Sequence, residues 1–285
     1  MASWLKLGVI AGGGELPVVL AEHLAASAQP YFVARITPMA DSALEGHPGA
    51  GHGLGAMGAR MQAMREAGCD AVVLIGQVAR PDIATLEFDD AARAMLPALL
   101  AAMPQGDDAL LRAVLAEHER AGFRVIGVEE AMVDLLAPAG AWGEVMPTPA
   151  LIKDIAKAAK VAAVSGAFDI GQGVVVCDGL VLAVEAQEGT DAMLRRVGEL
   201  PQPVRGTPAH RRGVLVKRPK PIQERRVDLP TVGVRTIETA AAAGLAGVAV
   251  EARGALTVRR DAIVAAANAA GMFVYGFTPE EVGEI

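Results

Sequence analysis

The chain is poor in cysteine, in aromatic residues and in positive charge. It has two cysteines in 285 residues, Cys69 and Cys177, and neither belongs to a CxxC pair. This pattern argues against a disulfide framework or a structural zinc site and indicates a reduced, cytoplasmic protein. Aromatic residues make up 4% and the formal net charge is −7. Platforms for stacked bases are therefore scarce, and we expect no nucleic-acid partner.

Long apolar runs and metal-binding histidine patterns are also missing. No uncharged apolar run reaches the roughly 20 residues that a membrane-spanning helix needs. The N-terminus reaches Gly12-Gly13-Gly14 before any long apolar run, which predicts a strand and a turn instead of a signal peptide. The five histidines show no metal-ligand spacing. These features indicate a soluble protein; peripheral contact with a membrane and a homodimer are both left open.

What is abundant is apolar sequence arranged in short strands and helices. Hydrophobic residues make up 52% of the chain, enough for two cores. In the first half, strands at 6–11, 31–35, 71–75 and 124–128 alternate with helical patterns, which predicts a Rossmann-like parallel sheet in an α/β fold. Pro and Gly cluster near 138–149. We therefore expect an N-terminal domain over 1–140, a linker over 141–150, and a C-terminal α/β catalytic and lipid-binding domain over 151–285.

The second half contains a two-residue hairpin signal. Strands Gly173–Cys177 and Leu180–Val184 flank Asp178-Gly179, a pair that supplies the positive φ angles of a type I′ turn. The regular register predicts these pairs: Cys177 with Leu180, Val174 with Ala183, Gln172 with Glu185 and, if the ladder extends, Asp169 with Glu188. The hairpin would thus bring several polar groups to one end of the sheet.

A dense set of polar residues surrounds this hairpin and continues to Asp228. Carboxylates and cations at strand ends are costly to desolvate, so a fold tends to place them there for a ligand or for each other. The alternative is a solvated rim of surface charge. Because both signs occur where strands stop and within a Pro-restrained loop, we favour an active site. Thr190 or Asp191 is a natural N-cap for the helix that follows.

Two loops of the first half are candidates for a nucleotide. Gly12-Gly13-Gly14 lies between a strand and a helix, where backbone amides can approach a phosphate. Gln77 and Arg80 follow a buried strand, at the edge where open α/β sheets bind ligands. A plain strand-to-helix turn and a capped loop are the alternatives. A true dinucleotide fingerprint is a poor match, because Pro17 occupies the third glycine position and the second strand ends at Arg35.

Several of these segments closely resemble the LpxI family, the UDP-2,3-diacylglucosamine pyrophosphatases of lipid A biosynthesis. The matching motifs are Gly8–Pro17, Gly106–Asp108, Asp169–Gly173, Cys177–Arg196 and Lys217–Gly233. The resemblance covers essentially the whole chain. It implies two α/β domains that close around the ligand with the active site in the cleft between them, and a magnesium (or manganese) ion as cofactor. It also implies hydrolysis of UDP-2,3-diacylglucosamine to UMP and 2,3-diacylglucosamine 1-phosphate (lipid X), with water attacking phosphorus.

The residues suit that chemistry, because a pyrophosphate needs charge neutralisation, an oriented water and a held leaving phosphate. We predict Asp228, Glu185 and Lys217 as catalytic residues, and Asp228, Glu185 and Asp191 as metal ligands. The predicted substrate-binding residues are Gly12, Gly13, Gly14, Gln77, Arg80, Asp169, Gln172, Glu188, Thr190, Asp191, Lys220 and Gln223. A non-catalytic nucleotide-binding protein and a nicotinamide-dependent oxidoreductase remain alternatives.

Overall fold

The structure, a computed structural model, describes residues 4–79, 82 and 85–283. The chain divides into two compact units. The first comprises Met1–Val133 and Glu224–Val227; the second comprises Asp134–Gln223 and Asp228–Ile285. Residues 141–150, which the sequence suggested as a linker, thus belong to the second unit, and a short segment from the second half of the chain belongs to the first. That a ligand binds between the units stays a prediction.

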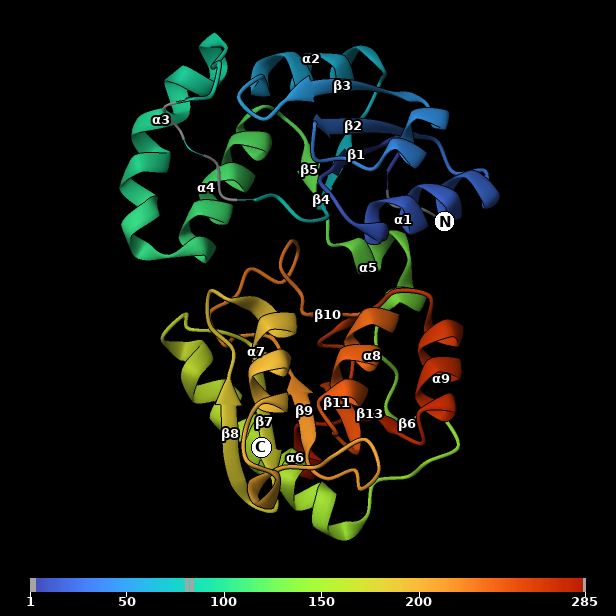
Figure 1. Ribbon diagram of the computed structural model, residues 1–285. Helices are drawn as coiled ribbons and strands as arrows, with labels where there is room; N and C mark the ends of the chain where they lie inside the picture. Colours follow the sequence, from blue (N-terminus) through green and yellow to red (C-terminus); the bar gives the residue numbers. More distant parts are fainter. Residues whose placement is uncertain (1–3, 80–81, 83–84, 284–285) are drawn as a thin grey trace. The chain divides into compact units, whose positions relative to one another are not determined.

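A parallel sheet forms the centre of the first unit. Among the described residues it has five strands in the order β3-β2-β1-β4-β5 (Figure 1). They are β1 (Leu7–Ala11), β2 (Tyr31–Thr37), β3 (Gly49–Gly53), β4 (Ala71–Ile75) and β5 (Arg124–Val125). The order and the parallel pairing confirm the predicted Rossmann-like fold, although β3 had no signal in its glycine-rich sequence and β5 ends earlier than expected. Val128, expected in that strand, begins a helix.

Helices of the first unit cover this sheet. They are α1 (Glu15–Ala26), α2 (Met57–Glu66), α3 (Asp90–Ala102), α4 (Asp107–Arg120) and α5 (Val128–Ala131). Met57, Met61 and Met64 of α2 recur at helical spacing and pack with apolar residues of α3, α4 and the strands. The Asp89 carboxylate caps α3 by accepting from the Ala92 N–H (2.8 Å) and also accepts from Ala59 of α2 (3.0 Å). One carboxylate therefore fixes two helix starts.

A mixed sheet forms the centre of the second unit. Its order in the described residues is β6-β13-β11-β9-β7-β8. The strands are β6 (Gly140–Ala141), β7 (Gly173–Cys177), β8 (Leu180–Val184), β9 (Val214–Lys217), β11 (Gly247–Glu251) and β13 (Phe273–Phe277), and a small separate pair consists of β10 (Thr231–Val232) and β12 (Leu256–Thr257). Strands β9, β11 and β13 run parallel, while β6, β7 and β8 pair antiparallel.

Side-chain alternation along these strands fills two cores. The helices are α6 (Pro149–Ala167), α7 (Gly189–Gly198), α8 (Val234–Ala242) and α9 (Arg260–Ala269). Val174 and Val176 of β7 pack with α6, whereas Val175 between them packs with α7, α8 and α9. The sheet therefore lies between α6 on one face and the other three helices on the opposite face (Figure 1).

The hairpin turn is confirmed, but its register is not. Asp178 and Gly179 have φ angles of 48° and 76°, as a type I′ turn requires, and Cys177 pairs with Leu180. A bulge follows, so the remaining predicted pairs are wrong. The observed partners are Val176 with Val181, Val175 with Ala183, Val174 with Val184, and Gly173 with Glu185 through the Glu185 N–H (2.8 Å). Leu182 is the extra residue that shifts the strand by one position.

Two expectations from composition concern disulfide bonds and membrane-spanning helices. Cys69 and Cys177 are free and buried, and burial raises the pKa of each thiol to about 11. Within residues 4–79, 82 and 85–283, no helix is both long enough and apolar enough to cross a membrane.

We predict that Asp154 fastens the hairpin turn to α6. Its buried carboxylate accepts the N–H groups of Asp178 (2.9 Å) and Gly179 (2.7 Å). Hydrogen bonds to a charged group contribute about 1.5–3 kcal/mol each, so Asp154→Ala should raise the hydrogen-exchange rates of these two amides at least tenfold. Lys153→Ala, at the exposed neighbouring position, serves as the control. Unchanged exchange at both amides in Asp154→Ala would contradict the prediction.

Candidate active site

A buried chain of polar groups links three of the predicted residues in the second unit. Lys217, at the end of β9, donates from Nζ to Thr190 Oγ1 (2.9 Å) and to the Thr231 carbonyl (3.2 Å). Thr190 in turn donates from Oγ1 to Glu185 Oε1 (2.8 Å). Glu185 is 7% exposed and Lys217 is 6% exposed. A carboxylate and an ammonium therefore balance each other through one hydroxyl, out of bulk water.

One oxygen of this group of Lys217, Thr190 and Glu185 has no hydrogen-bond partner among the described residues. Glu185 Oε2 is buried and, among the described residues, accepts no hydrogen bond. It lies against Gly173, where a Cβ atom would approach Oε2 to 2.3 Å. A side chain at position 173 would therefore displace this carboxylate from its present place. An unpaired anionic oxygen in a buried place is costly unless a water, a cation or a ligand donor reaches it.

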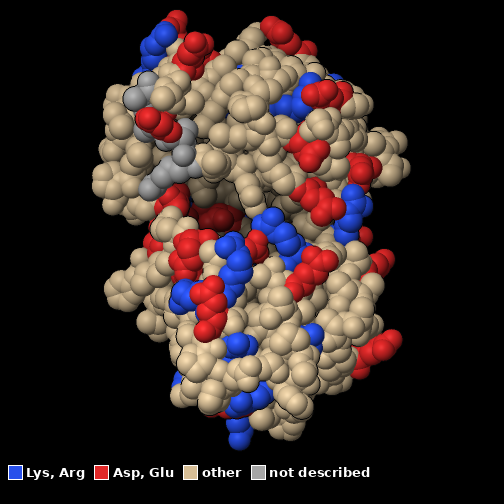
Figure 2. All heavy atoms as spheres, viewed as in Figure 1, with Lys and Arg blue, Asp and Glu red and all other residues tan. Residues whose placement is uncertain are grey.

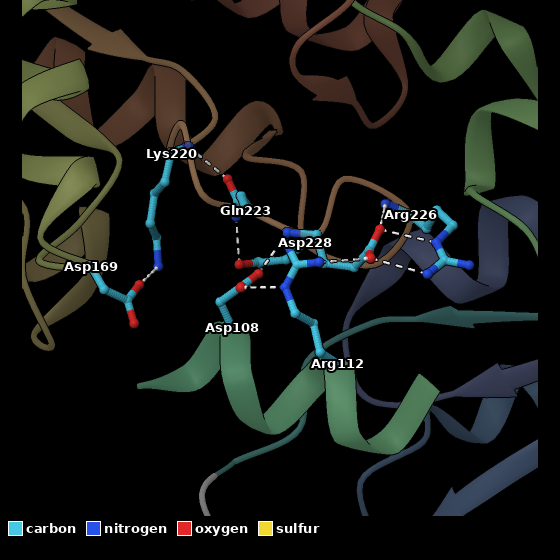
Figure 3. A network of polar contacts seen from close by, with 8 residues as sticks. Asp108, Arg112, Asp169, Lys220, Gln223, Arg226 and Asp228 are labelled. Atoms are coloured by element: carbon cyan, nitrogen blue, oxygen red, sulfur yellow. Dashed lines mark hydrogen bonds and ion pairs between the residues drawn. The ribbon is translucent and has the colours of Figure 1, made fainter. Parts of the chain in front are cut away.

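A second group of predicted residues meets in the loop after β9. Lys220 Nζ pairs with Asp169 Oδ1 (2.6 Å), and the Lys220 N–H donates to Gln223 Oε1 (2.8 Å). Gln223 Nε2 donates to Asp228 Oδ2 and, at 3.4 Å, to Gln172 Oε1. In Figure 3, Lys220 reaches from the loop after β9 to Asp169, which follows α6, and Gln223 of the same loop lies against Asp228. The structure thus unites five residues that the sequence could only place near strand termini.

The two groups meet at the ends of β7 and β9. Gly173 pairs with Lys217 in the ladder, and the Arg218 N–H donates to the Gln172 carbonyl (3.1 Å). Both groups therefore lie where β7 begins and β9 ends, with Gln172 between them. Eight of the predicted residues share this place: Glu185, Lys217 and Asp228 of the catalytic set, and Asp169, Gln172, Thr190, Lys220 and Gln223 of the substrate-binding set.

Arg218 and Glu251 form a buried ion pair that the sequence analysis missed. Arg218 Nη2 lies 2.9 Å from Glu251 Oε2, and Arg218 Nη1 donates to the Ala159 carbonyl of α6 (3.2 Å). Both side chains are about nine-tenths buried. The signal was present in the alternation of β9: Lys217 follows Leu215 on the α7 face, so Arg218 must continue toward α6, where a cation needs a carboxylate.

Glu188 and Asp191 are not brought into this group. Glu188 is exposed and pairs with Arg196 (2.7 Å), a hydrogen bond that holds the pKa of Glu188 below its usual value. Asp191 pairs with Arg235. Neither Thr190 nor Asp191 is the N-cap, because α7 begins at Gly189 and the Thr190 hydroxyl is committed to Glu185. The assignment of Glu188 and Asp191 as substrate contacts stays a prediction.

The glycine turn of the first unit is tied to the end of the neighbouring strand. Gly13 and Gln77 exchange both backbone hydrogen bonds (2.7 and 2.8 Å), so the segments after β1 and β4 lie side by side. A Cβ at Gly12 would approach the Gln77 carbonyl to 2.5 Å. Gly14 has a φ of 88° and caps α1, where helix N–H groups are available to an anion. Arg80 lies outside the described residues.

Charges of both signs lie on one face of the molecule. On the face drawn in Figure 2, Lys and Arg side chains alternate with Asp and Glu side chains instead of forming one broad basic patch.

Comparison with known proteins gives the family. The model of the LpxI N-terminal domain matches residues 6–135, and the model of the LpxI C-terminal domain matches residues 138–275. The chain belongs to the LpxI family. A relative from Caulobacter vibrioides (strain ATCC 19089 / CIP 103742 / CB 15), named UDP-2,3-diacylglucosamine pyrophosphatase LpxI, is 53% identical over 276 residues, covering 97% of this chain and 99% of the relative.

The magnesium ion that the LpxI resemblance implies fits part of the predicted ligand set. Mg²⁺ is usually held by one or two carboxylates together with substrate phosphates and waters. Oε2 of Glu185 has no partner among the described residues, and Asp228 uses Oδ2 for Gln223, so both side chains offer a carboxylate oxygen. Asp191 pairs through Oδ2 with Arg235, and its assignment as a metal ligand stays a prediction. In the described residues, no three His, Cys, Asp or Glu side chains form a metal-binding group.

We predict strong coupling between Glu185 and Lys217. Lys217→Met removes the charge that balances a buried carboxylate, which should cost on the order of 3 kcal/mol in unfolding free energy. The double variant Glu185→Gln/Lys217→Met leaves no buried charge and should recover much of this loss. Urea unfolding in a Trp4→Phe background, where Trp142 alone reports on the second unit, measures the effect. Additive losses in the double variant would refute the coupling.

Proposed function

We propose that this protein hydrolyses the pyrophosphate bond of UDP-2,3-diacylglucosamine, releasing UMP and 2,3-diacylglucosamine 1-phosphate (lipid X) in lipid A biosynthesis. The observation that carries the proposal is the 53% identity, over nearly the full length of both chains, to a relative named for this activity. The oxidoreductase and the non-catalytic nucleotide-binding protein are set aside, because neither accounts for the grouped carboxylates and lysines at the ends of β7 and β9.

Asp228 is the residue on which the proposed chemistry depends. It is half-buried and its Oδ2 is held by Gln223, so its carboxylate has a defined direction. In this role it orients the attacking water or holds the metal ion. When bound, Mg²⁺ would neutralise charge on the diphosphate, with Asp228 and Glu185 as the carboxylates offered to it.

Lys220 supplies positive charge to the diphosphate. Its ammonium has three N–H donors, of which Asp169 takes one (2.6 Å), so the remaining donors can meet phosphate oxygens. The pairing with Asp169 fixes the direction of a flexible side chain before substrate arrives. Lys217 is more deeply buried, and its ammonium balances the negative charge of Glu185 through the Thr190 hydroxyl.

An apolar groove formed by the last turns of α6 and the residues that follow it suits an acyl chain. It has a volume of about 410 Å³ and is lined by Lys160, Val161, Val164, Ser165, Phe168 and Ile170. Phe168 is 76% exposed and Val164 is 64% exposed, an unusual amount of apolar surface for side chains of this size. Phe168 precedes Asp169, the partner of Lys220, so the groove begins where the phosphate-binding group ends. This continuity supports its assignment to the lipid half of the substrate.

The location and the assembly of the protein remain expectations under this proposal. Two buried free thiols agree with a cytoplasmic setting, and a lipid product agrees with peripheral contact at the inner membrane. These expectations, and a homodimer, stay predictions.

Asp228→Asn tests the chemical role. The variant keeps the size and the hydrogen-bonding capacity toward Gln223 but removes the negative charge, so kcat should fall about 100-fold or more while KM changes little. UMP release from UDP-2,3-diacylglucosamine, measured over a range of Mg²⁺ concentrations, gives both constants. Asp261→Asn, an exposed site on α9, is the control. Turnover near the unsubstituted rate would remove Asp228 from the mechanism, whereas an unsubstituted protein that releases no UMP would refute the function.

Phe168→Gln tests the groove. Burying a side chain of this size contributes about 1.5–3 kcal/mol, so the variant should raise KM for the diacylated substrate about 10- to 100-fold with kcat nearly unchanged. Leu180→Gln, a comparably exposed apolar site on β8, should leave KM unchanged. If Phe168→Gln and Leu180→Gln behave alike, the acyl chain lies elsewhere.

A further inference from the structure

A short segment of the loop that carries Asp228 belongs to the other unit of the protein. Residues 224–227 are part of the first unit, whereas Gln223 before them and Asp228 after them are part of the second. The chain thus leaves the second unit directly before one polar site residue and returns directly at another. The contacts that hold this segment therefore act one peptide bond away from the proposed reacting carboxylate.

The start of α4 holds the beginning of the segment. Asp108 Oδ1 accepts the backbone N–H of Glu224 at 2.6 Å, and Asp108 Oδ2 accepts from Arg112 Nε, also at 2.6 Å. Arg112 Nη1 lies 3.4 Å from Glu224 Oε2. Figure 3 shows Asp108 and Arg112 rising from the same helix toward the segment. A carboxylate that accepts from the main chain fixes where the backbone runs, because the amide cannot rotate away from it as a side chain would.

Arg226 ties the middle of the segment to the same helix. Its Nε and Nη2 donate to the two oxygens of Glu224, at 3.0 Å each, and its Nη1 donates to Glu119 Oε1 of α4 at 2.7 Å. The hydrogen bonds from Arg226 hold the pKa of Glu224 below its usual value. This forked geometry is specific to a guanidinium, since a lysine ammonium has no planar pair of donors.

Apolar packing fixes the end of the segment. Val227 packs against the first unit's core, which includes Met95 of α3 and Leu115 of α4. The next residue is Asp228, whose Oδ2 accepts from Gln223, and Leu229 after it is buried. Asp228 is therefore hydrogen-bonded through its side chain to Gln223 and follows directly in sequence on Val227, which packs in the core of the first unit.

We propose that Glu224 and Arg226 are positioning residues for Asp228 in pyrophosphate hydrolysis. The inference rests on the proposed function. Arg226 and Glu224 are 36% and 14% exposed, and ion pairs with one solvated partner contribute at most about 1 kcal/mol to folding. What the pairs provide is geometry: a displacement of about 1 Å in a reacting group can lower a rate about 100-fold.

Arg226→Met and Arg226→Lys test the assignment. Both variants break the fork to Glu224, so kcat should fall at least tenfold while KM stays within about twofold, and lysine should restore little of the loss. Arg120→Met is the matched control, because Arg120 lies on α4 but, in the part of the chain that the structure describes, pairs only with Glu117 of its own helix. It should keep full activity. A normal kcat in Arg226→Met would overturn the proposal.

A double-mutant cycle shows whether Arg226 acts through Asp228. In the Asp228→Asn background, Arg226→Met should cause no further loss in single-turnover rate, measured with enzyme in excess over hours. An equal fold-loss in both backgrounds would mean an independent role and overturn the proposal. The side-chain amide resonance of Gln223 gives a second readout, since it should shift in Arg226→Met when Asp228 moves; a lowered kcat with that resonance unchanged also overturns it.

These outcomes separate the inference from the function on which it rests. Loss of activity in Asp228→Asn together with full activity in Arg226→Met refutes the positioning role alone. Full activity in Asp228→Asn refutes the role of Asp228, and the positioning role with it.

Discussion

Alternation of side chains along β9 is the constraint on which the second unit depends. Leu215 and Lys217 face the helices α7 to α9, whereas Val216 and Arg218 face α6. Two adjacent cations therefore enter two different buried environments, and each must find an anion there. Lys217 is linked to Glu185 by hydrogen bonds through the Thr190 hydroxyl, and Arg218 forms an ion pair with Glu251. Because a buried charge without a partner costs several kcal/mol, these pairings fix how β7, β8, β11 and α7 approach the end of β9.

The polar loop that follows inherits its place from this arrangement. Once β9 ends between two satisfied cations, Lys220 can reach Asp169 and Gln223 can reach both Gln172 and Asp228. Asp228, the proposed reacting group, thus belongs to a loop that follows two cations whose charges are already balanced by Glu185 and Glu251. A preorganised arrangement of this kind lets a phosphate-binding group act without rearranging when charge develops.

The sequence predicted what depends on local pattern. Strand and helix alternation gave the parallel sheet of the first unit, and Asp178-Gly179 gave the turn, because both are set by residues close in sequence. It failed where one residue of register or a distant partner decides. The bulge at Leu182 moved Glu185 opposite Gly173 instead of Gln172, and nothing in an apolar strand announces such an insertion. The ion pairs of Glu188 with Arg196 and of Asp191 with Arg235 also could not be read from the sequence, and the site roles of these two carboxylates stay predictions. The polar residues in the sequence indicated the region of the site. Which of these residues pair with one another became clear only from the distances in the structure.

The segment of residues 224–227 also changes what counts as a half of this protein. A gene fragment that stops at Val133 would encode the sheet of the first unit but not the residues that satisfy Asp108 and Glu119 or pack on the core beside α4. The first half of the chain is thus incomplete as a freestanding module. An exchange of amino-terminal halves between homologues would separate residues 224–227 from the α4 residues that bind them, unless this tetrapeptide were exchanged as well.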